Sequence, residues 1–321
     1  MKSNGIRTID LFCGCGGMVL GFKNAGFETV SAADNWDAAL ETLAANLPDV
    51  ETVNIDLSKR EHAFSFIRNQ KAELIIGGPP CQDFSHAGKR DESMGRADLT
   101  VSFAETVAHS NVKWFVMENV DRAKNSNAIR IAKKVFEDAG YGLTEAILDA
   151  SLCNVPQKRK RYFLIGELGG KDSFLLDRLL QGLSHVPLTV RQFFHDNGLE
   201  LDTEFYYRHP RTYARRGIFS IDEPSPTIRG VNRPIPSTYR KHKNDPVGPE
   251  RARPLTAKER SLIQTFPNGF EFCGTKTEIE QMIGNAVPVK MAEYVARCLH
   301  DHIAGSSVIS LGQLALVFDD N

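Results

Sequence analysis

The sequence predicts a doubly wound α/β fold: a mostly parallel sheet of seven strands, with a smaller and irregular second domain. In the first half of the chain, short apolar runs alternate with amphipathic helical segments, which is typical of strands joined by helices that cover both faces of a sheet. After residue 166 the periodicity weakens, and Pro, Arg and Tyr become frequent. A helical pattern then returns near the C-terminus.

Each predicted strand is a short apolar run bounded by Gly, Pro or Asp. The strands are expected at residues 7–12, 28–33, 50–55, 73–78, 112–118, 143–148 and 161–166. Helical spacing of apolar residues predicts helices at residues 18–25, 37–46, 127–139, 256–266 and 289–302. Closely spaced prolines predict loops, or edge strands at most, at residues 225–230 and 233–236.

Composition and charge narrow the class of protein. Of the 321 residues, 41% are hydrophobic and 25% charged, as in ordinary globular proteins. No apolar run approaches the roughly 18 residues of a membrane helix, and no signal-peptide pattern is visible, so we expect a cytoplasmic protein without membrane contact. Residues 204–253 hold eleven Lys or Arg against five Asp or Glu, although the net charge is −1. Such a basic segment is typical of a surface that follows nucleic-acid phosphates, but a solvated face explains the charge equally well.

One of the six cysteines differs from the others in its surroundings. No Cys-x-x-Cys spacing occurs, so neither a zinc site nor disulfides are expected, and most cysteines should be small buried hydrophobes. Cys81, however, follows two glycines and two prolines just past a predicted strand, where a rigid turn would expose a nucleophilic thiol. Glu118 ends the next strand, so adjacent strand ends would bring the two side chains to one rim. A carboxyl beside a thiol suits an aromatic electrophile that needs a proton before attack.

The first predicted strand runs into a glycine-rich turn, DLFCGCGG at residues 10–17. Backbone N–H groups in such a turn approach an anionic ligand, although a purely structural turn is the alternative. Asp34 falls 20 residues after Gly14, where a carboxylate binds ribose hydroxyls, and Asp56 ends the third strand, where it can accept a bond from an adenine amino group. The spacing is not the strict Gly-x-Gly-x-x-Gly of dinucleotide enzymes, which favours S-adenosylmethionine over NAD.

Taken together, these segments resemble the C5-cytosine-specific DNA methyltransferases of prokaryotic type. The resemblance spans residues 8–299 and is weakest between 170 and 250. It rests on DLFCGCGG (10–17), GGPPCQDFS (77–85), ENV (118–120), QKRKRYFLIG (157–166), RPLTAKER (253–260) and GNAVPV (284–289), in that order. It implies a Rossmann-like S-adenosylmethionine-dependent methyltransferase sheet. It also implies three parts: a catalytic and cofactor-binding domain (1–166), a target recognition domain and hinge (167–280), and a C-terminal helix that returns to the catalytic domain (281–321).

The resemblance also implies a mechanism. Cys81 would attack carbon 6 of a cytosine flipped out of duplex DNA, while Glu118 helps to protonate ring N3. Arg161 would contact the cytosine O2, and Gln157 and Arg159 would brace the catalytic loop and the DNA backbone. Carbon 5 would take the methyl group, leaving S-adenosylhomocysteine, and a water is expected to remove the carbon-5 proton. Residues 82–98 would close over the flipped base.

Two further sets of site residues follow from the resemblance. The cofactor-binding residues are Phe12, Gly14, Gly16, Gly17, Asp34, Asp56, Pro80, Leu99, Asn285 and Val287. Phe12 and Leu99 have an alternative as core residues, and Asn285 as a helix N-cap. The DNA-binding residues are Gln82, Ser85, Lys89, Arg96, Arg208, Arg211, Arg215, Arg229 and Arg233. Each of these arginines is expected to contact a phosphate or a protein group rather than to read a base.

The predicted enzyme is a monomer that binds double-stranded DNA and no metal, in a prokaryotic cell or phage-infected host. It would belong to a restriction–modification pair, with a cognate endonuclease that acts on the same site without stable contact, or act alone as an orphan methyltransferase. The alternative is an RNA (tRNA) cytosine methyltransferase on the same scaffold, but such relatives have a reduced recognition region, and the long region at 167–252 favours DNA. A catalytically inactive homologue is disfavoured by the intact Cys81, Glu118 and glycine turn, and an oxidoreductase does not explain the Pro-Pro-Cys-Gln segment.

Overall fold

The computed structural model describes residues 4–68, 70–80, 99–210, 212 and 215–306. Its centre is a seven-stranded sheet in the order β3-β2-β1-β4-β5-β8-β6. These strands are β1 (Arg7–Leu11), β2 (Glu28–Asp34), β3 (Glu51–Asn54), β4 (Leu74–Gly77), β5 (Trp114–Val120), β6 (Tyr141–Asp149) and β8 (Lys160–Leu168). Only β8 runs against its neighbours β5 and β6, and the pairs from β3 to β5 are parallel. The mostly parallel sheet is therefore confirmed.

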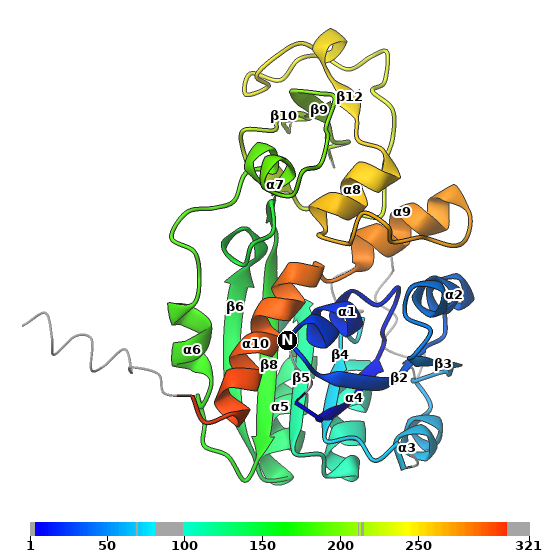
Figure 1. The fold of residues 1–321 in the computed structure, drawn as a ribbon, viewed down its shortest axis with the longest axis vertical. Coiled ribbons are helices and arrows are strands. Elements are labelled where there is room, and N and C mark those ends of the chain that lie inside the picture. The colour runs from blue at the N-terminus through cyan, green and yellow to red at the C-terminus, as the bar shows by residue number, and fades with distance from the viewer. Residues whose placement is uncertain (1–3, 69, 81–98, 211, 213–214, 307–321) are drawn as a thin grey trace, which may run out of the picture.

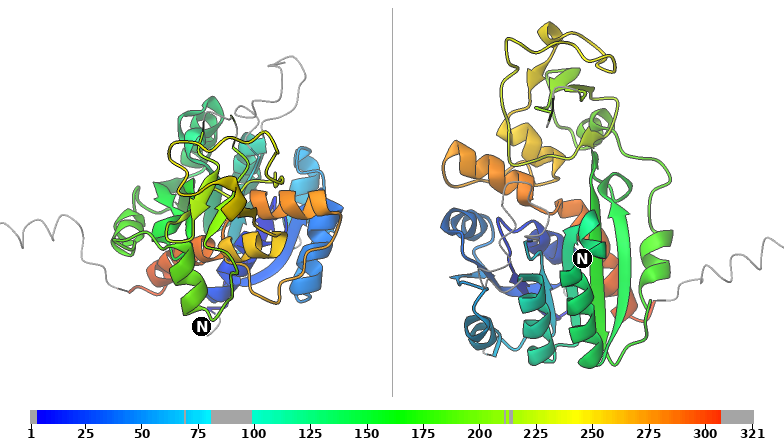
Figure 2. Two further views of the ribbon diagram at one scale, coloured as in Figure 1. Left: turned by 90° about the horizontal axis from the view of Figure 1, so that it is seen from above. Right: turned by 180° about the vertical axis from the view of Figure 1, so that it is seen from behind.

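Helices cover both faces of this sheet (Figures 1 and 2). One face carries α1 (Gly17–Asn24), α6 (Leu176–Gln181) and α10 (Val289–Ile303), and the other carries α3 (Arg60–Arg68), α4 (Leu99–Ser110) and α5 (Asn127–Asp138). Neighbouring strand residues enter opposite cores: Ile76 packs with the first helices and Ile75 with the second. Because side chains alternate along a strand, a sheet covered on both faces requires continuous apolar runs.

A smaller part of the molecule lies beyond the carboxyl ends of the parallel strands (Figure 1). It contains the sheet β10-β9-β12 and has its own apolar cores. Its elements are β9 (Phe205–Tyr207), β10 (Ile218–Ser220), β12 (Arg253–Pro254), α7 (Val190–Asp196), α8 (Ala257–Ile263) and the short helix at Pro249–Arg251. The helix α9 (Lys276–Asn285) contributes to this part and also packs against α2 (Asp37–Asn46). We call this part the target module.

Two short strands join the target module to the main sheet. β11 (Ser225–Pro226) runs parallel to β7 (Gln157–Lys158), which immediately precedes β8. The segment at residues 225–230, predicted as a loop or at most an edge strand, thus contains a strand of two residues. The 3-10 turns at Asp121–Asn125 and Ala150–Leu152 complete the elements of the main part. α6 lies beyond residue 166 yet packs on the main core beside α10, and the division of the chain at residues 166 and 280 stays a prediction.

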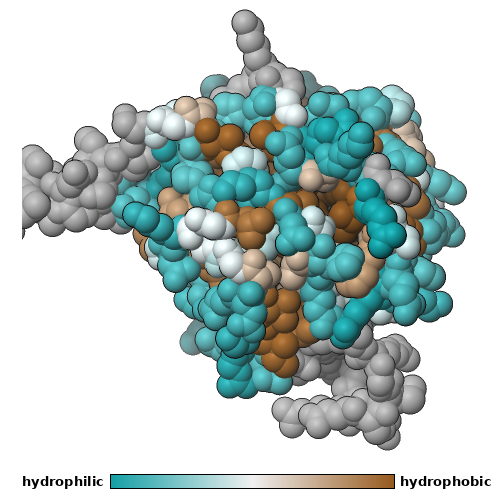
Figure 3. Space-filling view, turned by 90° about the horizontal axis from the view of Figure 1, so that it is seen from below, coloured by the Kyte–Doolittle hydropathy of each residue, from teal (hydrophilic) through white to brown (hydrophobic). Residues whose placement is uncertain are grey.

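The surface seen from below, opposite the target module, is largely hydrophilic with small hydrophobic areas between the polar side chains (Figure 3). Within the described residues, none of the helices is long and apolar enough to cross a membrane.

Candidate active site

The side chain of Asp34, at the end of β2, binds the glycine turn that follows β1. The backbone N–H of Gly14 donates to Asp34 Oδ2 at 2.9 Å, and Asp34 Oδ1 accepts the N–H groups of Asn35 and Trp36 at 2.8 and 3.1 Å. Burial raises the pKa of Asp34, while these three N–H groups oppose the rise. Gly16, the N-cap of α1, has a φ of 87°, a left-handed conformation that strains any residue with a Cβ.

The turn between α9 and α10 packs directly on the start of α1. A Cβ added to Gly17 would lie closer than 3.0 Å to the carbonyl oxygen of Val287, so this contact is open only to glycine. Val287 is buried, whereas Asn285 is exposed and is the last residue of α9. The alternative role of Asn285 as an N-cap is wrong, because α10 has Pro288 as its N-cap and no side-chain cap. The glycine turn (residues 10–17) and the α9–α10 turn (residues 284–287) therefore pack together. We call the surface that they form the cradle.

Asp10 is a buried acid that sequence reasoning did not select as a site residue. It lies near the end of β1 and is 1% exposed, and neither of its carboxyl oxygens has a hydrogen-bond partner among the described residues. Burial, reinforced by Asp34, raises its pKa well above the usual value. An unpartnered buried carboxyl is costly, so a cationic ligand group or a held proton suits this position. Its place within the glycine motif was the available signal.

The other predicted cofactor residues lie around the same rim. Phe12 has a φ of 65°, is half-buried and packs against the second core, as its core alternative predicted, while its contact with a cofactor stays a prediction. Asp56 is two residues past β3, and hydrogen bonds from Ser58 lower its pKa. Pro80 is exposed just past β4, and Leu99 is half-buried at the start of α4.

A buried ion pair lies at the adjacent end of β5. Arg161 Nε on β8 is 2.8 Å from Glu118 Oε1, and their side chains are 13% and 10% exposed. Burial raises the pKa of Glu118, while the positive charges of Arg161 and Arg159 oppose that rise. The carboxyl is therefore placed to hold or release a proton at a higher pH than an exposed glutamate does.

The segment leading to residue 81 packs against this pair. Asn119 Nδ2 donates to the carbonyl oxygen of Pro79 at 3.0 Å, and a Cβ added to Gly78 would meet Glu118 Oε2 at 3.2 Å. β4 and β5 are parallel neighbours, so their carboxyl ends share one rim as expected. Six predicted residues lie outside the described residues. They are Cys81, Gln82, Ser85, Lys89, Arg96 and, in the target module, Arg211.

Gln157 and Arg159 are buried rather than exposed to a ligand, at 0% and 2%. Arg159 Nη1 donates to the carbonyl oxygen of Ile228 at 3.0 Å, and Nη2 donates to those of Gly284 and Ala286 at 3.1 Å each. In this structure these residues brace the protein's own turns. Their predicted contacts with the catalytic loop involve residues outside the described ones.

The predicted arginines of the target module fall into two groups. Arg208 donates to the carbonyl oxygen of Thr227, and Arg229 donates to that of His209, so both hold the module's own backbone. Arg215 and Arg233 are exposed. Arg211 lies outside the described residues.

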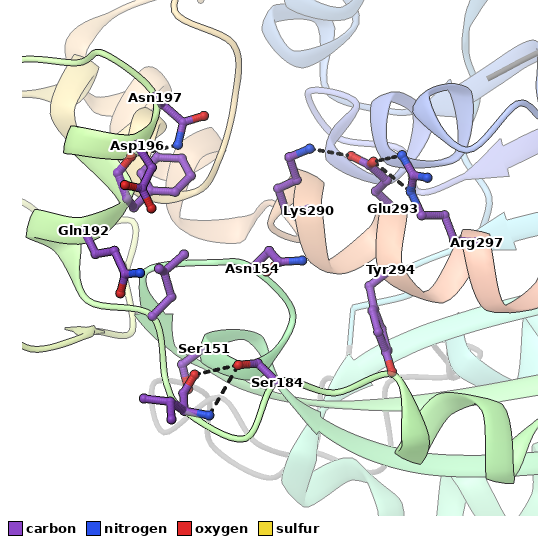
Figure 4. Close-up of a pocket in the computed structure, with 13 residues that line it drawn as sticks. Ser151, Asn154, Ser184, Gln192, Asp196, Asn197, Lys290, Glu293, Tyr294 and Arg297 are labelled. Atoms are coloured by element: carbon purple, nitrogen blue, oxygen red, sulfur yellow. Dashed lines mark hydrogen bonds and ion pairs between the residues drawn. The ribbon is translucent and has the colours of Figure 1, made fainter.

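A cleft of about 820 Å³ lies elsewhere, between α7 and α10 (Figure 4). Its lining residues all fall outside the predicted site. The five described cysteines are free, and the described residues contain no cluster of three or more His, Cys, Asp or Glu that would hold a metal ion.

Comparison with known proteins agrees with this geometry. The family model for C-5 cytosine-specific DNA methylase matches residues 6–301. The type II methyltransferase M.HgiDI of Herpetosiphon aurantiacus is 55% identical over 93% of this chain and 95% of that protein. M.HindV of Haemophilus influenzae is 56% identical over 92% of this chain and 96% of that protein. The fold is shared with S. pombe Dnmt2, at a TM-score of 0.69 and 20% identity over 94% of this chain and 99% of that one.

Proposed function

The chain belongs to the C-5 cytosine-specific DNA methylase family and is a DNA (cytosine-5-)-methyltransferase, and from that premise we propose that Cys81, Glu118 and Arg161 carry the reaction. The observation that supports this assignment most directly is the buried Glu118–Arg161 pair, packed against the turn that delivers residue 81. A nucleophile at that position would lie beside a carboxyl whose pKa is raised.

In the proposed reaction, the Cys81 thiolate forms a bond to carbon 6 of a flipped-out cytosine. Glu118 delivers a proton to ring N3, so the electron pair displaced by the thiolate builds up at carbon 5. Arg161 holds the Glu118 carboxyl through Nε, and we assign its guanidinium to the cytosine O2 as well. After carbon 5 is methylated, water takes the carbon-5 proton and Cys81 leaves carbon 6 as a thiolate. Ring N3 then returns its proton to Glu118, which restores the aromatic ring and the protonated carboxyl.

We assign S-adenosylmethionine to the cradle formed by the glycine turn and the α9–α10 turn. When bound, it supplies an electrophilic methyl group on a sulfonium. Asp34 would hold the ribose hydroxyls and Asp56 the adenine amino group, while the turn's N–H groups face the methionine carboxylate. The unpartnered carboxyl of Asp10 suits the positive part of the ligand. The residues assigned to line the remainder are Phe12, Gly14, Gly16, Gly17, Pro80, Leu99, Asn285 and Val287.

We infer that the substrate is a specific site in double-stranded DNA, methylated as the protective half of a type II restriction–modification pair. The near full-length similarity to proteins named type II methyltransferases supports this inference. The exposed Arg215 and Arg233 are assigned to DNA phosphates, while Arg208 and Arg229 shape the module's backbone. The endonuclease partner, the monomeric state and the cytoplasmic location stay predictions.

The test combines labelled S-adenosylmethionine, mixed-sequence duplex DNA and bisulfite sequencing of the product. We expect label on DNA as 5-methylcytosine, whereas label on tRNA with none on DNA would contradict the proposed substrate. Cys81→Ser should lose both activity and the covalent adduct with 5-fluorocytosine DNA. The matched control is Cys273→Ser, at a free and half-buried cysteine, which should keep both. An adduct that survives in Cys81→Ser would show that the nucleophile is misassigned.

A further inference from the structure

Two buried glutamines meet where the main sheet, the target module and the cofactor cradle come together. Gln157 Nε2 donates to Gln264 Oε1 at 2.7 Å, and both side chains are 0% exposed. Gln157 Oε1 accepts the backbone N–H of Ile228 at 2.9 Å. Gln264 Nε2 donates to the carbonyl oxygens of Ile283 and Ala286. These bonds use both ends of each amide, so neither side chain can flip without loss.

The backbone of Gln264 also fixes the start of α10. Its carbonyl oxygen accepts the N–H of Val289 at 3.0 Å, and the neighbouring Thr265 Oγ1 accepts that of Lys290 at 2.9 Å. The first N–H groups of a helix have no partner within the helix. Gln264 and Thr265 therefore supply the cap that Pro288 lacks.

This network reaches the cofactor cradle through a short path. The turn at residues 284–287, fixed by Gln264 and Arg159, contacts the start of α1 at Gly17. On its other side, Gly284 lies against the backbone of Arg229 and Gly230 in the target module. A displacement of the module segment 228–230 would thus be transmitted to the turn that lines the cofactor cradle.

On another side of the molecule a cleft lies between the two parts. There α7 and α10 face each other across the cleft of about 820 Å³ (Figure 4). The ion pairs of Glu293 with Lys290 and Arg297 stay within α10, and Asn197 bonds to Phe193 within α7. The network around Gln264, unlike this cleft, joins the target module to the cradle through buried hydrogen bonds.

We propose that Gln264 is a positioning residue that, through Gln157, couples target recognition to cofactor binding. It touches neither reacting partner itself. It fixes the 284–287 turn and, through Gln157, the module segment at Ile228, so that DNA bound to the module and cofactor bound in the cradle favour the same arrangement. This proposal rests on the proposed function, since it needs a cofactor in the cradle and DNA on the module.

The test uses the full chain and the variants Gln264→Met, Gln157→Met and their combination. Met has nearly the length of Gln but cannot make these bonds. Titration calorimetry measures S-adenosylhomocysteine affinity with and without a duplex that carries the methylated site. For the wild type we expect the duplex to tighten this affinity. For Gln264→Met we expect affinity without DNA to fall about tenfold, the cost of leaving one buried polar partner unsatisfied, and the enhancement by DNA to approach one.

Because the two glutamines act as one unit, the double variant should lose no more than Gln264→Met alone. The control is Asp245→Asn, which disturbs bonds to Gly217, Ile218 and Tyr239 within the target module. It should lower Tm and weaken DNA binding, while S-adenosylhomocysteine affinity without DNA stays within about twofold.

Two results would overturn the proposal. One is a Gln264→Met protein with lowered Tm but unchanged ligand affinity and unchanged enhancement by DNA, because that is a purely structural role. The other is a wild type in which the two ligands bind independently. A wild type that binds no S-adenosylhomocysteine at all would instead refute the proposed cofactor, so the two failures are distinguishable.

Discussion

Replacing Gly284 by alanine tests whether backbone atoms of the target module pack directly against the end of α9, where the turn at residues 284–287 begins. Gly284 lies in the last turn of α9. A Cβ added there would come closer than 3.0 Å to the backbone N of Gly230 and the carbonyl carbon of Arg229. Because these atoms belong to the main chain, they cannot rotate away, and the module segment itself must move.

Two opposing effects determine the magnitude. Alanine is a better helix former than glycine by about 1 kcal/mol, which alone would stabilise the variant. Inserting a methyl group into a close-packed contact costs about 1–3 kcal/mol, and the upper end applies where the neighbours are backbone. We therefore expect a net loss of about 1–2 kcal/mol in the free energy of unfolding, with Tm lower by a few degrees.

The assay combines urea unfolding with steady-state methylation. If the module shifts to relieve the contact, the KM for DNA should rise, since Arg229 and Gly230 are displaced. Gly269→Ala is the matched control, because a Cβ there meets nothing within 4 Å and the φ lies outside the left-handed region. That variant should be unchanged or up to about 1 kcal/mol more stable.

A Gly284→Ala protein as stable as Gly269→Ala, with an unchanged KM for DNA, would refute this reasoning. The added methyl group would then fit, and the module segment could not lie where the structure places it. A Gly284→Ala protein that is more stable than the wild type would also refute this reasoning, because only the higher helix propensity of alanine would then affect stability.

Three further predictions concern buried charges. Glu118→Gln should lower kcat about 10²–10⁴-fold, as expected for loss of a general acid, with S-adenosylhomocysteine affinity kept within twofold in calorimetry; a kcat within threefold of wild type would remove Glu118 from the proton transfer. Burial raises the folded-state pKa of Glu118 above its ordinary value of 4.5. The protonated Glu118 side chain therefore contributes fully to stability below pH 4.5, and this contribution is lost as the pH rises through the raised pKa. The stability of Glu118→Gln relative to wild type should therefore increase over that interval in urea titrations, and a constant difference would contradict the shift. Glu280→Met leaves Arg260 buried without its charge partner and should cost about 3–5 kcal/mol; an Arg260→Met, Glu280→Met double variant that is less stable still would show that the pair is not the cause.

The fold could be predicted closely from the sequence because strands that are buried on both faces of the sheet appear as continuous apolar runs. The adjacent residues Ile75 and Ile76 enter different cores, so the strand had to be apolar throughout. The predicted nucleophile motif starts at the end of β4, and Glu118 lies near the end of β5. Parallel neighbouring strands place such ends on one rim. Those parts of the site follow from local sequence and topology alone.

The positioning network could not be predicted in the same way. Gln264 closes a predicted amphipathic helix, where a polar side chain is usual, and its partner Gln157 is 107 residues away. Asp10 looked like an ordinary member of the glycine motif until its carboxyl was seen to be buried without a partner. In both cases the role of the polar residue depends on residues that are close in space but distant in the sequence.

For Arg159 the signal was present in the sequence. Residues 157–160 alternate between buried and exposed, with Gln157 and Arg159 inside and Lys158 and Lys160 outside. Side chains of a short strand alternate with this period of two. The sequence Gln-Lys-Arg-Lys is therefore consistent with a strand whose Gln and Arg face the protein interior and whose two Lys face solvent. The resemblance implied that Arg159 braces the catalytic loop and the DNA backbone. The structure shows that it bonds to the protein's own turns, while its contact with DNA stays a prediction.

The same alternation places Arg161 on the face that carries Gln157 and Arg159. On one face of residues 157–161, Gln157 thus bonds to the target module at Ile228, and Arg159 bonds to the turn at residues 284–287. On the same face, Arg161 pairs with the Glu118 carboxyl. Because the side-chain period is two, an inserted residue between Arg159 and Arg161 would turn Arg161 away from Glu118, or else turn Gln157 and Arg159 toward solvent. The proposed catalytic pair, Glu118 and Arg161, and the proposed positioning network therefore share one register, and we expect any variant of this segment that keeps activity to preserve the spacing of both.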